Sequence, residues 1–187
     1  KALKGKSQVS TVLSETETYD DINPVRINSN GVSAFVSIMR GCENYCAYCV
    51  VPYTRGKERS RSVESIVDEI KHLISKGYKE VTLLGQNVNS YLWEDKNGEE
   101  YNFSKLISII AELDDNLRVR FATSHPKDLS DVLILTIPNH KNICKHIHLP
   151  LQSGSTKVLK KMNRKYTQEW YLDRIKSIKK YIPDCSI

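Results

Sequence analysis

The chain has 187 residues, of which 40% are hydrophobic and 27% are charged, and its formal net charge at pH 7 is +6. This length favours a single domain with a sizeable core, and no apolar run approaches the length of a membrane span, which argues against a membrane protein. The modest basic excess permits a nucleic-acid partner without requiring one.

Residues 1–30 are predicted to form a linker or an extended arm. They are rich in serine, threonine and charged groups, and turn signals occur at Asn23-Pro24 and Asn30-Gly31. No hydrophobic period runs between these signals, and a segment that cannot bury apolar area forms no core of its own. The folded domain is therefore expected to span residues 31–187.

Strands and helices alternate from residue 32 onward. The first helix is expected to begin after Ser62, an N-cap residue, and to end near Gly77, where a C-terminal glycine belongs. Repeated βα units with buried strands indicate an α/β fold with a parallel sheet or a (β/α) barrel. Strands are predicted at residues 32–39, 79–84, 118–122 and 146–149 and from 185, and further helices at about 103–113, 129–137, 156–162 and 168–181.

Three cysteines, Cys42, Cys46 and Cys49, follow the first predicted strand at C-x3-C-x2-C spacing. Thiolates select iron–sulfur clusters, zinc or copper(I). A four-iron cluster held by three cysteines leaves one iron open, whereas a structural zinc site needs a fourth ligand. The other two, Cys144 and Cys185, precede predicted strands and are therefore expected at the opposite end of the sheet. Both an open cluster site and a zinc site agree with this spacing.

These five cysteines also bear on the compartment. An odd count in a chain without a secretory signal argues against a disulfide framework. Reduced thiols favour the cytoplasm.

Four unusual loops follow the first four predicted strands, at residues 42–49, 85–87, 123–126 and 150–155. In parallel βα folds, catalytic groups lie on the loops after the strands, at their carboxyl ends. We therefore expect all four loops to gather at one rim of the sheet.

The cysteine loop, with Tyr48 as the aromatic of Cys-x3-Cys-x-aromatic-Cys, resembles the cluster-binding loop of the radical S-adenosylmethionine (radical SAM) enzymes. From about residue 32 to the end, the chain is similar to the methylthiotransferases of that superfamily, which makes zinc the weaker alternative. The segments that carry this resemblance are Ser37-Ile38-Met39-Arg40-Gly41-Cys42, Pro52-Tyr53-Thr54-Arg55-Gly56, Leu84-Gly85-Gln86-Asn87-Val88-Asn89-Ser90-Tyr91, Thr123-Ser124-His125-Pro126 and His148-Leu149-Pro150-Leu151-Gln152-Ser153-Gly154-Ser155.

The resemblance implies a partial (β/α) barrel, with four βα units and the start of a fifth present out of six. It implies methylthiolation at C2 of dimethylallyl (isopentenyl) adenosine beside the anticodon of tRNA. Sister enzymes, which act on threonylcarbamoyl-adenosine or on a ribosomal protein aspartate, are the alternatives, and a non-catalytic zinc-binding RNA module is an alternative of another class.

The resemblance also implies cofactors and partners. Cys42, Cys46 and Cys49 would hold a 4Fe-4S cluster whose open iron binds S-adenosylmethionine. A second 4Fe-4S cluster would belong to an N-terminal domain and tRNA contacts to a C-terminal one, so this chain is expected to be an incomplete core without full turnover. The partners would be the tRNA anticodon stem-loop and an electron donor such as flavodoxin or ferredoxin.

Further site residues follow from the same resemblance. The segment 85–87 takes the place of a glycine-rich motif that meets the methionyl amino group, with amides in place of a carboxylate. Tyr48 would offer its backbone to the adenine, with ordinary core packing of its ring as the alternative. A turn that caps the next helix is the alternative for the segment 152–155, and for Ser155 it is preferred. The cofactor-binding residues expected are Tyr48, Gly85, Gln86, Asn87, Ser124, Gln152 and Ser153.

Basic residues alternate along the segment just beyond the cysteines, and an extended chain would present them on one side. Such a ladder suits phosphates, although a charge run is more often a solvated surface. Its place next to the cysteines favours contact with tRNA, with contact to a substrate-bound partner domain as the alternative. The expected RNA-binding residues are Arg55, Lys57, Arg59 and Arg61. A second basic group, at residues 157–165, is interpreted as a solvated helix.

Histidines add two further expectations. His125 lies on the predicted rim. His146 and His148 alternate along the fourth predicted strand and therefore share one face. A core histidine is the preferred interpretation, and a lining of the barrel by one or both is the alternative.

Overall fold

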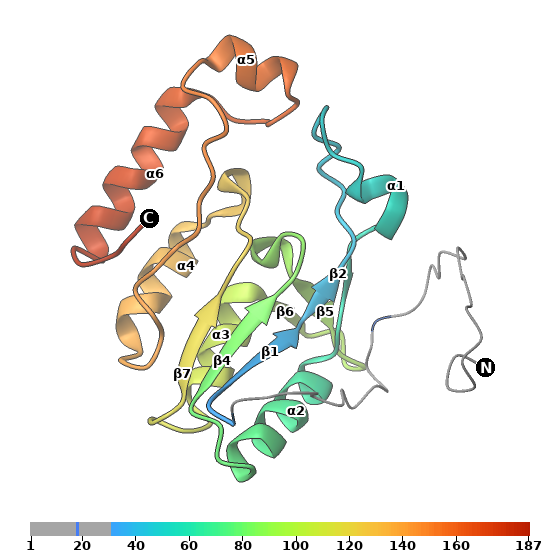
Figure 1. Ribbon diagram of the computed structural model, residues 1–187, viewed down its shortest axis with the longest axis vertical. Helices are drawn as coiled ribbons and strands as arrows, with labels where there is room; N and C mark the ends of the chain where they lie inside the picture. Colours follow the sequence, from blue (N-terminus) through green and yellow to red (C-terminus); the bar gives the residue numbers. More distant parts are fainter. Residues whose placement is uncertain (1–17, 19–30) are drawn as a thin grey trace.

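The computed structural model describes Thr18 and residues 31–187, so the predicted arm at residues 1–30 lies, apart from Thr18, outside the described part. Three parallel strands form the central sheet in the order β1-β4-β7 (Figure 1). They are β1 (Ser33–Ser37), β4 (Glu80–Leu84) and β7 (Arg118–Phe121). The predicted α/β class with a parallel sheet is confirmed, and within the described residues the sheet stays open.

Helix α2 (Val63–Ser75) connects β1 to β4 and shows why the predicted helix boundaries were right. The Ser62 hydroxyl accepts a hydrogen bond from the Ser65 backbone nitrogen at 3.3 Å, which caps the first turn. Gly77 has a φ of +88° just beyond the last turn, a conformation that favours glycine. Ile66, at helical spacing within α2, is fully buried, which stabilises the fold by about 1.5–3 kcal/mol.

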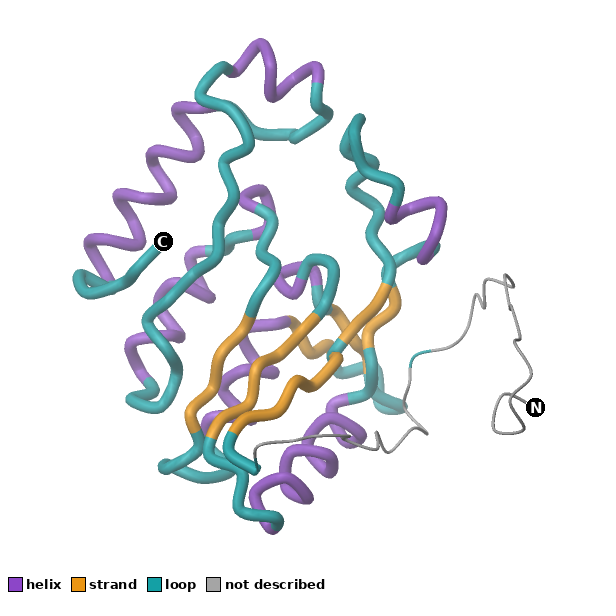
Figure 2. The backbone as a smooth tube through the Cα atoms, viewed as in Figure 1, coloured by secondary structure: helices purple, strands orange, loops and turns teal. Residues whose placement is uncertain are grey.

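Helices cover one face of the sheet and leave the other face open (Figures 1 and 2). The alternation along the strands explains this: Ala34 and Val36 of β1 are buried, whereas Phe35 between them is 69% exposed. The core also contains Leu106 and Ile110 of α3. The other helices in the described residues are α3 (Phe103–Ala111), α4 (Asp131–Thr136), α5 (Thr156–Lys161) and α6 (Gln168–Tyr181).

Several short elements were not predicted. A two-stranded antiparallel ladder, β2 (Met39–Arg40) with β3 (Arg59–Ser60), brackets the cysteine loop and a short helix, α1 (Val51–Arg55). The others are β5 (Leu92–Glu94) paired with β6 (Glu100–Asn102), and the 3-10 turns η2 (Val88–Ser90), η3 (Pro126–Asp128) and η4 (Ile137–Asn139). None of the helices in the part described could cross a membrane.

The prediction of a fourth strand at residues 146–149 is wrong, because this segment forms no regular strand. Only isolated parallel bridges form, Val119 with Ile143 and His146 with Ser186. The His146 backbone nitrogen donates to the Cys144 carbonyl at 2.9 Å, and this local bend interrupts the ladder with β7. The expected start of a fifth strand near residue 185 is reduced to the bridge at Ser186. Figure 2 shows the segment before α5 as a loop that runs beside β7.

The open face carries a hollow of about 300 Å³, and it overturns the interpretation of two histidines. His146 and His148 both line this hollow and are exposed, so they are not core histidines. His146 shares a hydrogen bond of 2.8 Å between Nδ1 and the Ser186 hydroxyl. The expectation that the two share one face is confirmed, and the preferred core interpretation is wrong. Their place beside the open face of the sheet agrees with the alternative, in which they line the barrel.

Candidate metal centre

The cysteine loop leaves the sheet at Gly41, a position that only glycine fits. Gly41 has a φ of +81°, and a Cβ built there would lie 1.8 Å from the carbonyl oxygen of Lys57. The Gly41 nitrogen donates to Oε1 of Gln86 at 2.6 Å, which ties the loop to the end of β4. The next residue, Cys42, donates its nitrogen to the Gly56 carbonyl at 3.1 Å. The loops after β1 and β4 therefore meet at one rim, as predicted.

The three loop cysteines are free thiols in different surroundings: Cys46 is buried, and Cys42 and Cys49 are half-buried. Burial raises the pKa of the Cys42 thiol, although a hydrogen bond of 3.4 Å from Asn44 Nδ2 to its sulfur favours the thiolate. Within residues 31–187, no three cysteine, histidine, aspartate or glutamate side chains converge on one point as ligands of a single ion. The donor set nevertheless fits a thiolate-bound cluster, since hydrogen-bond donors are aimed at two of the sulfurs, those of Cys42 and Cys46.

The two remaining cysteines lie elsewhere. The Cys144 sulfur accepts a hydrogen bond of 2.8 Å from Nε of Arg118, the first residue of β7. Cys185 is buried next to the bridge at Ser186. Cys144 is thus at the opposite end of the sheet from the cysteine loop, as predicted.

The segment after α5 packs against the cysteine loop. The Ala47 nitrogen donates to the Met162 carbonyl at 3.0 Å. Nδ2 of Asn163 donates to the carbonyl oxygens of Tyr45 at 2.9 Å and Asn44 at 3.3 Å. Two loops more than a hundred residues apart in the chain therefore hold each other, which no local pattern in the sequence predicted.

The interpretation of the second basic group as solvated holds for its four exposed lysines and is wrong at Arg164. Its side chain is buried, with the residue only 5% exposed. Nη1 lies 3.2 Å from the Cys46 sulfur and 3.4 Å from the Tyr48 hydroxyl, and Nε donates to the Tyr166 hydroxyl at 3.1 Å. Among the residues that the structure describes, none of these partners is a carboxylate. The guanidinium is therefore a buried cation beside a cysteine that sequence analysis assigned to the metal.

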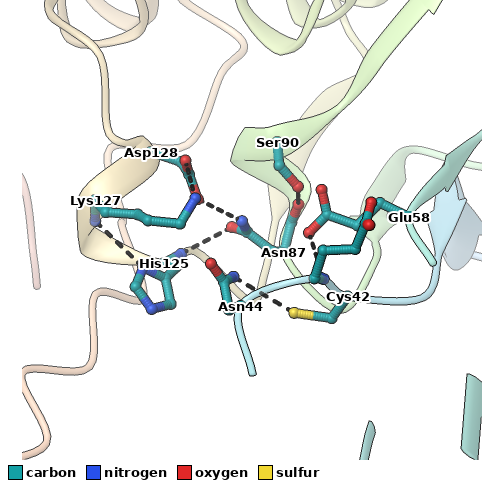
Figure 3. Close-up of polar contacts among 9 residues, drawn as sticks. Cys42, Asn44, Glu58, Asn87, Ser90, His125, Lys127 and Asp128 are labelled. Atoms are coloured by element: carbon teal, nitrogen blue, oxygen red, sulfur yellow. Dashed lines mark hydrogen bonds and ion pairs between the residues drawn. The ribbon is translucent and has the colours of Figure 1, made fainter. Parts of the chain in front are cut away.

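A polar network centred on Asn87 joins the loops after β4 and β7 (Figure 3). Asn87 is 1% exposed; its Oδ1 accepts from the His125 nitrogen at 3.0 Å, and its Nδ2 donates to Asp128 at 2.6 Å. The loop after β7 thus reaches the rim as predicted. Asn87 braces this rim, and its expected contact with a cofactor remains a prediction.

The imidazole ring of His125 has a buried N–H donor at this rim. Its Nδ1 accepts a hydrogen bond of 3.3 Å from the Lys127 nitrogen, which assigns the ring proton of the neutral form to Nε2. In the described structure, neither this Nε2 nor the buried Ser124 hydroxyl has a hydrogen-bond partner. Buried polar groups without partners are rare and mark places where a ligand or water binds. The expected contact of Ser124 with a cofactor has this support.

Glu58 is a carboxylate near the cysteine loop that sequence analysis missed. It accepts a hydrogen bond of 3.3 Å from the Glu43 nitrogen, and burial raises the pKa of its carboxyl group. Figure 3 shows it with Ser90 beside Cys42. Glu58 follows α1 within a stretch of alternating basic residues. Because that stretch was interpreted from its positive charges, this carboxylate was not predicted as a site residue.

The other predicted cofactor residues have clear local roles. A Cβ on Gly85 would lie 2.5 Å from Cγ of Met39, so the strand end needs glycine for close packing. Ser153 accepts a hydrogen bond from the Ser155 nitrogen at 3.2 Å, and Ser155 caps α5, as the turn interpretation expected. Gln152 is exposed and has a φ of +72°. Tyr48 is 54% exposed, so ordinary core packing of this residue is wrong.

The basic ladder is wrong at Arg61. This residue is 3% exposed, and its Nη1 binds Oε2 of Glu69 at 2.7 Å and the Ser37 carbonyl at 2.8 Å. Removing one partner of such a buried pair destabilises a protein by about 3–5 kcal/mol. The segment also begins in helix α1, so Arg55 does not lie on an extended chain.

Arg59 is half-buried and donates to the Arg55 carbonyl at 2.9 Å. Arg55 and Lys57 are the members of the predicted ladder that remain exposed.

Burial of His125 predicts a pH-dependent stability. Burial is the largest cause that lowers its pKa, to about 3, and the Arg164 charge adds to it. The unfolded chain binds a proton below pH 6.5 and the folded chain does not until about pH 3, so stability falls as the pH drops below 6.5. Between pH 8 and pH 5 we expect a loss of about 2 kcal/mol in the free energy of unfolding, measured by urea titration.

The variant His125→Gln is expected to abolish this loss. The exposed His148 provides the control, and His148→Gln is expected to keep it. A wild-type free energy of unfolding that stays constant from pH 8 to pH 5 would contradict a buried neutral His125.

The model of the Radical SAM superfamily matches residues 36–187. The chain is 59% identical over 183 residues to the tRNA-2-methylthio-N(6)-dimethylallyladenosine synthases of Bacteroides fragilis and Bacteroides thetaiotaomicron, and 50% identical over 186 residues to that of Porphyromonas gingivalis. These matches cover 98–100% of this chain and 40% of each relative, so the chain spans about two fifths of their length.

Solved structures agree on the fold. The cobalamin-dependent S-adenosylmethionine radical enzyme OxsB matches 77% of this chain and 22% of its own, with a TM-score of 0.57 and 16% identity. The radical S-adenosylmethionine methyltransferase TsrM from Kitasatospora setae, solved with cobalamin and a 4Fe-4S cluster, matches 82% of this chain and 29% of its own, with a TM-score of 0.56 and 19% identity. At this identity the likeness concerns the fold alone.

Proposed function

Because this chain belongs to the radical SAM superfamily, we propose that it is the radical core of an enzyme that methylthiolates C2 of dimethylallyl (isopentenyl) adenosine in tRNA. The observation that carries this proposal is 50–59% identity, over nearly the whole chain, to synthases named for that product. The cysteine loop at the carboxyl end of β1 supports it, because this is where parallel βα enzymes keep their reactive groups.

Cys42, Cys46 and Cys49 would hold a 4Fe-4S cluster with one iron left for S-adenosylmethionine. Bound there, the two groups would supply radical chemistry that amino-acid side chains cannot perform. The fit rests on three free thiols on one loop and on donors from Asn44 and Arg164 aimed at sulfur. A second cluster, which would deliver sulfur, is proposed for a part of the protein outside this chain, as the resemblance to the methylthiotransferases implies.

The polar groups of the rim would orient the cofactor and exclude water. Within the described part of the chain, the Ser124 hydroxyl and the His125 Nε2–H are buried and have no hydrogen-bond partner, so they could bind polar atoms of S-adenosylmethionine or of the target nucleoside. The Tyr48 backbone would meet the adenine, and the exposed Gln152 would hydrogen-bond the nucleoside or the carboxylate. The buried Asn87 holds the backbone nitrogen of His125, so it would keep this donor in place.

Two alternative functions can be distinguished from this proposal. The sister methylthiotransferases, acting on threonylcarbamoyl-adenosine or on a ribosomal protein aspartate, would share the cysteine loop, but the similar Bacteroides synthases carry the dimethylallyladenosine name. A zinc-binding RNA module would contain zinc in place of iron and acid-labile sulfide. We further propose a cytoplasmic location and reduction by a flavodoxin or ferredoxin, since the substrate and the low-potential electrons are found together there.

The test uses the intact protein, reconstituted with iron and sulfide under anaerobic conditions. It is incubated with S-adenosylmethionine, a reductant and tRNA that carries only dimethylallyladenosine, and the nucleosides are then analysed by mass spectrometry. We expect a product in which a methylthio group replaces the C2 hydrogen, and none from tRNA that carries threonylcarbamoyl-adenosine. Methylthiolation of the threonylcarbamoyl tRNA alone would assign the chain to the sister activity, and zinc without iron would refute the catalytic proposal.

The exposed part of the basic segment is expected to bind tRNA phosphates. In the double variant Arg55→Ala/Lys57→Ala, log K for tRNA should fall less steeply with log salt concentration, by about 0.7–0.9 for each phosphate that is no longer neutralised. Filter binding across a salt series measures this slope. The double variant Lys71→Ala/Lys76→Ala, on α2 and at its C-cap, removes the same charge from exposed positions. This helix lies far from the cysteine loop, so an equal effect there would contradict a local interaction (Figure 1).

A further inference from the structure

His125 has a buried hydrogen-bond donor that nothing in the described part of the chain accepts. The residue is 6% exposed, and its Nε2 atom has no partner among the described residues. Nδ1 accepts a hydrogen bond of 3.3 Å from the Lys127 nitrogen, so the proton of the neutral ring is on Nε2. A buried donor without a partner is unfavourable, and at the rim of the sheet it indicates a ligand that accepts from it.

The direction of this donor is fixed by its neighbours. Oδ1 of Asn87 accepts from the His125 backbone nitrogen at 3.0 Å (Figure 3). The Tyr166 ring meets the imidazole edge to face, with the ring centroids 5.7 Å apart, and the Tyr166 hydroxyl donates to the Leu151 carbonyl at 2.9 Å. Contacts from three separate segments therefore hold the imidazole, and a donor with a fixed direction can recognise one acceptor atom of a bound ligand.

An uncharged acceptor fits this donor best. Burial and, after it, the charge of Arg164 lower the pKa of His125 to about 3, so the ring is neutral at pH 7. The carboxylate of S-adenosylmethionine would favour a charged imidazolium and does not suit a ring that its surroundings keep neutral. The target adenine has neutral acceptors at N1 and N3, the two ring nitrogens beside C2. Enzymes that modify a base recognise it by hydrogen bonds to such edge atoms.

We infer that the Nε2–H of His125 donates a hydrogen bond to N1 or N3 of the target adenine and thereby positions C2 at the rim. This inference rests on the proposed function, because it requires dimethylallyladenosine as the substrate. C2 is one bond away from either nitrogen, so a hydrogen bond from the loop after β7 fixes where C2 lies relative to the cysteine loop. His125 is then a specificity-determining residue of the substrate site.

The test compares three synthetic anticodon stem-loops that bind the intact, reconstituted protein. One contains dimethylallyladenosine, and the other two contain its 1-deaza or its 3-deaza analogue, in which a C–H group replaces one ring nitrogen. All three have the same phosphates, so the ratios of their Kd values report the contact with the base. For the wild-type protein we expect Kd to rise by about 5–150-fold for one analogue, as for a buried donor left unpaired, and to change little for the other.

Three variants connect this loss to the imidazole. His125→Leu removes the donor and is expected to weaken binding of the parent stem-loop, with no further loss for the sensitive analogue. His125→Gln keeps an amide N–H donor and is expected to retain part of the discrimination. His72→Leu, at an exposed position on α2, is the matched control and is expected to discriminate as the wild-type protein does.

Equal Kd values of the wild-type protein for all three stem-loops would overturn the inference, and this measurement requires no variant to fold. Weaker binding of S-adenosylmethionine by His125→Leu at an unchanged Kd for the parent stem-loop would also overturn it, because the donor would then serve the cofactor. Methylthiolation of the parent stem-loop by the wild-type protein would leave the proposed function intact in both cases. A wild-type protein that neither binds nor methylthiolates the parent stem-loop would refute the proposed function and the inference with it.

Discussion

Replacing Cys46 with alanine is expected to abolish the cluster and reduce methylthiolation by more than about 100-fold, since losing a ligand exceeds the 10–100-fold loss typical of groups that only support ligands. Cys46 is the buried member of the three loop cysteines and the one that Arg164 contacts. With a small side chain there, the guanidinium of Arg164 would face a void in place of a sulfur. Iron and acid-labile sulfide per chain, measured after anaerobic reconstitution, quantify the loss.

Cys144→Ala provides the control for this measurement. Cys144 is also a free thiol, but it lies at the start of β7 beside Arg118, away from the cysteine loop. Its replacement is expected to leave the iron and sulfide content of the loop cluster unchanged. A Cys46→Ala protein with the wild-type iron content and activity would refute the assignment of the three ligands.

Replacing Gly41 with alanine is expected to have the second large effect, a loss of at least about 3 kcal/mol in the free energy of unfolding. The left-handed backbone costs about 1–2 kcal/mol for a residue with a Cβ, and forced overlap in a packed site costs a further 1–3 kcal/mol. The overlap is severe, because the Cβ would lie 1.8 Å from the Lys57 carbonyl oxygen. Urea unfolding measures the loss, and the same shift would displace Cys42 and impair cluster assembly.

Gly77→Ala separates the two contributions. Gly77 also has a left-handed φ, of +88°, but nothing lies within 4 Å of a Cβ built there. Gly77→Ala is expected to lose only the backbone contribution, about 1–2 kcal/mol. Equal losses at Gly41 and Gly77 would show that the approach of Lys57 to Gly41 is relaxed at no cost, contrary to the structure.

The local elements of the fold were predictable because their signals are local. Helix α2 begins after Ser62 and ends before Gly77 as its capping residues indicated, and α6 (Gln168–Tyr181) has the predicted bounds. The strand expected at residues 146–149 failed for the opposite reason. Its apolar residues alternate as in a strand. Strand pairing, however, depends on hydrogen bonds to distant segments, and the His146 nitrogen donates to the nearby Cys144 carbonyl in a local bend.

For the candidate site, the sequence by itself determined the three cysteines, the loops at the rim and the superfamily, since these depend on residue type and spacing along a short stretch. Only the tertiary structure decided which basic residues are exposed. Arg61 and Arg164 belong to charge runs that look solvated, yet each is buried by partners from elsewhere: Ser37 and Glu69 for Arg61, and Cys46 for Arg164. The burial of a long charged side chain depends on what packs over it, and that is set by contacts between segments far apart in the chain.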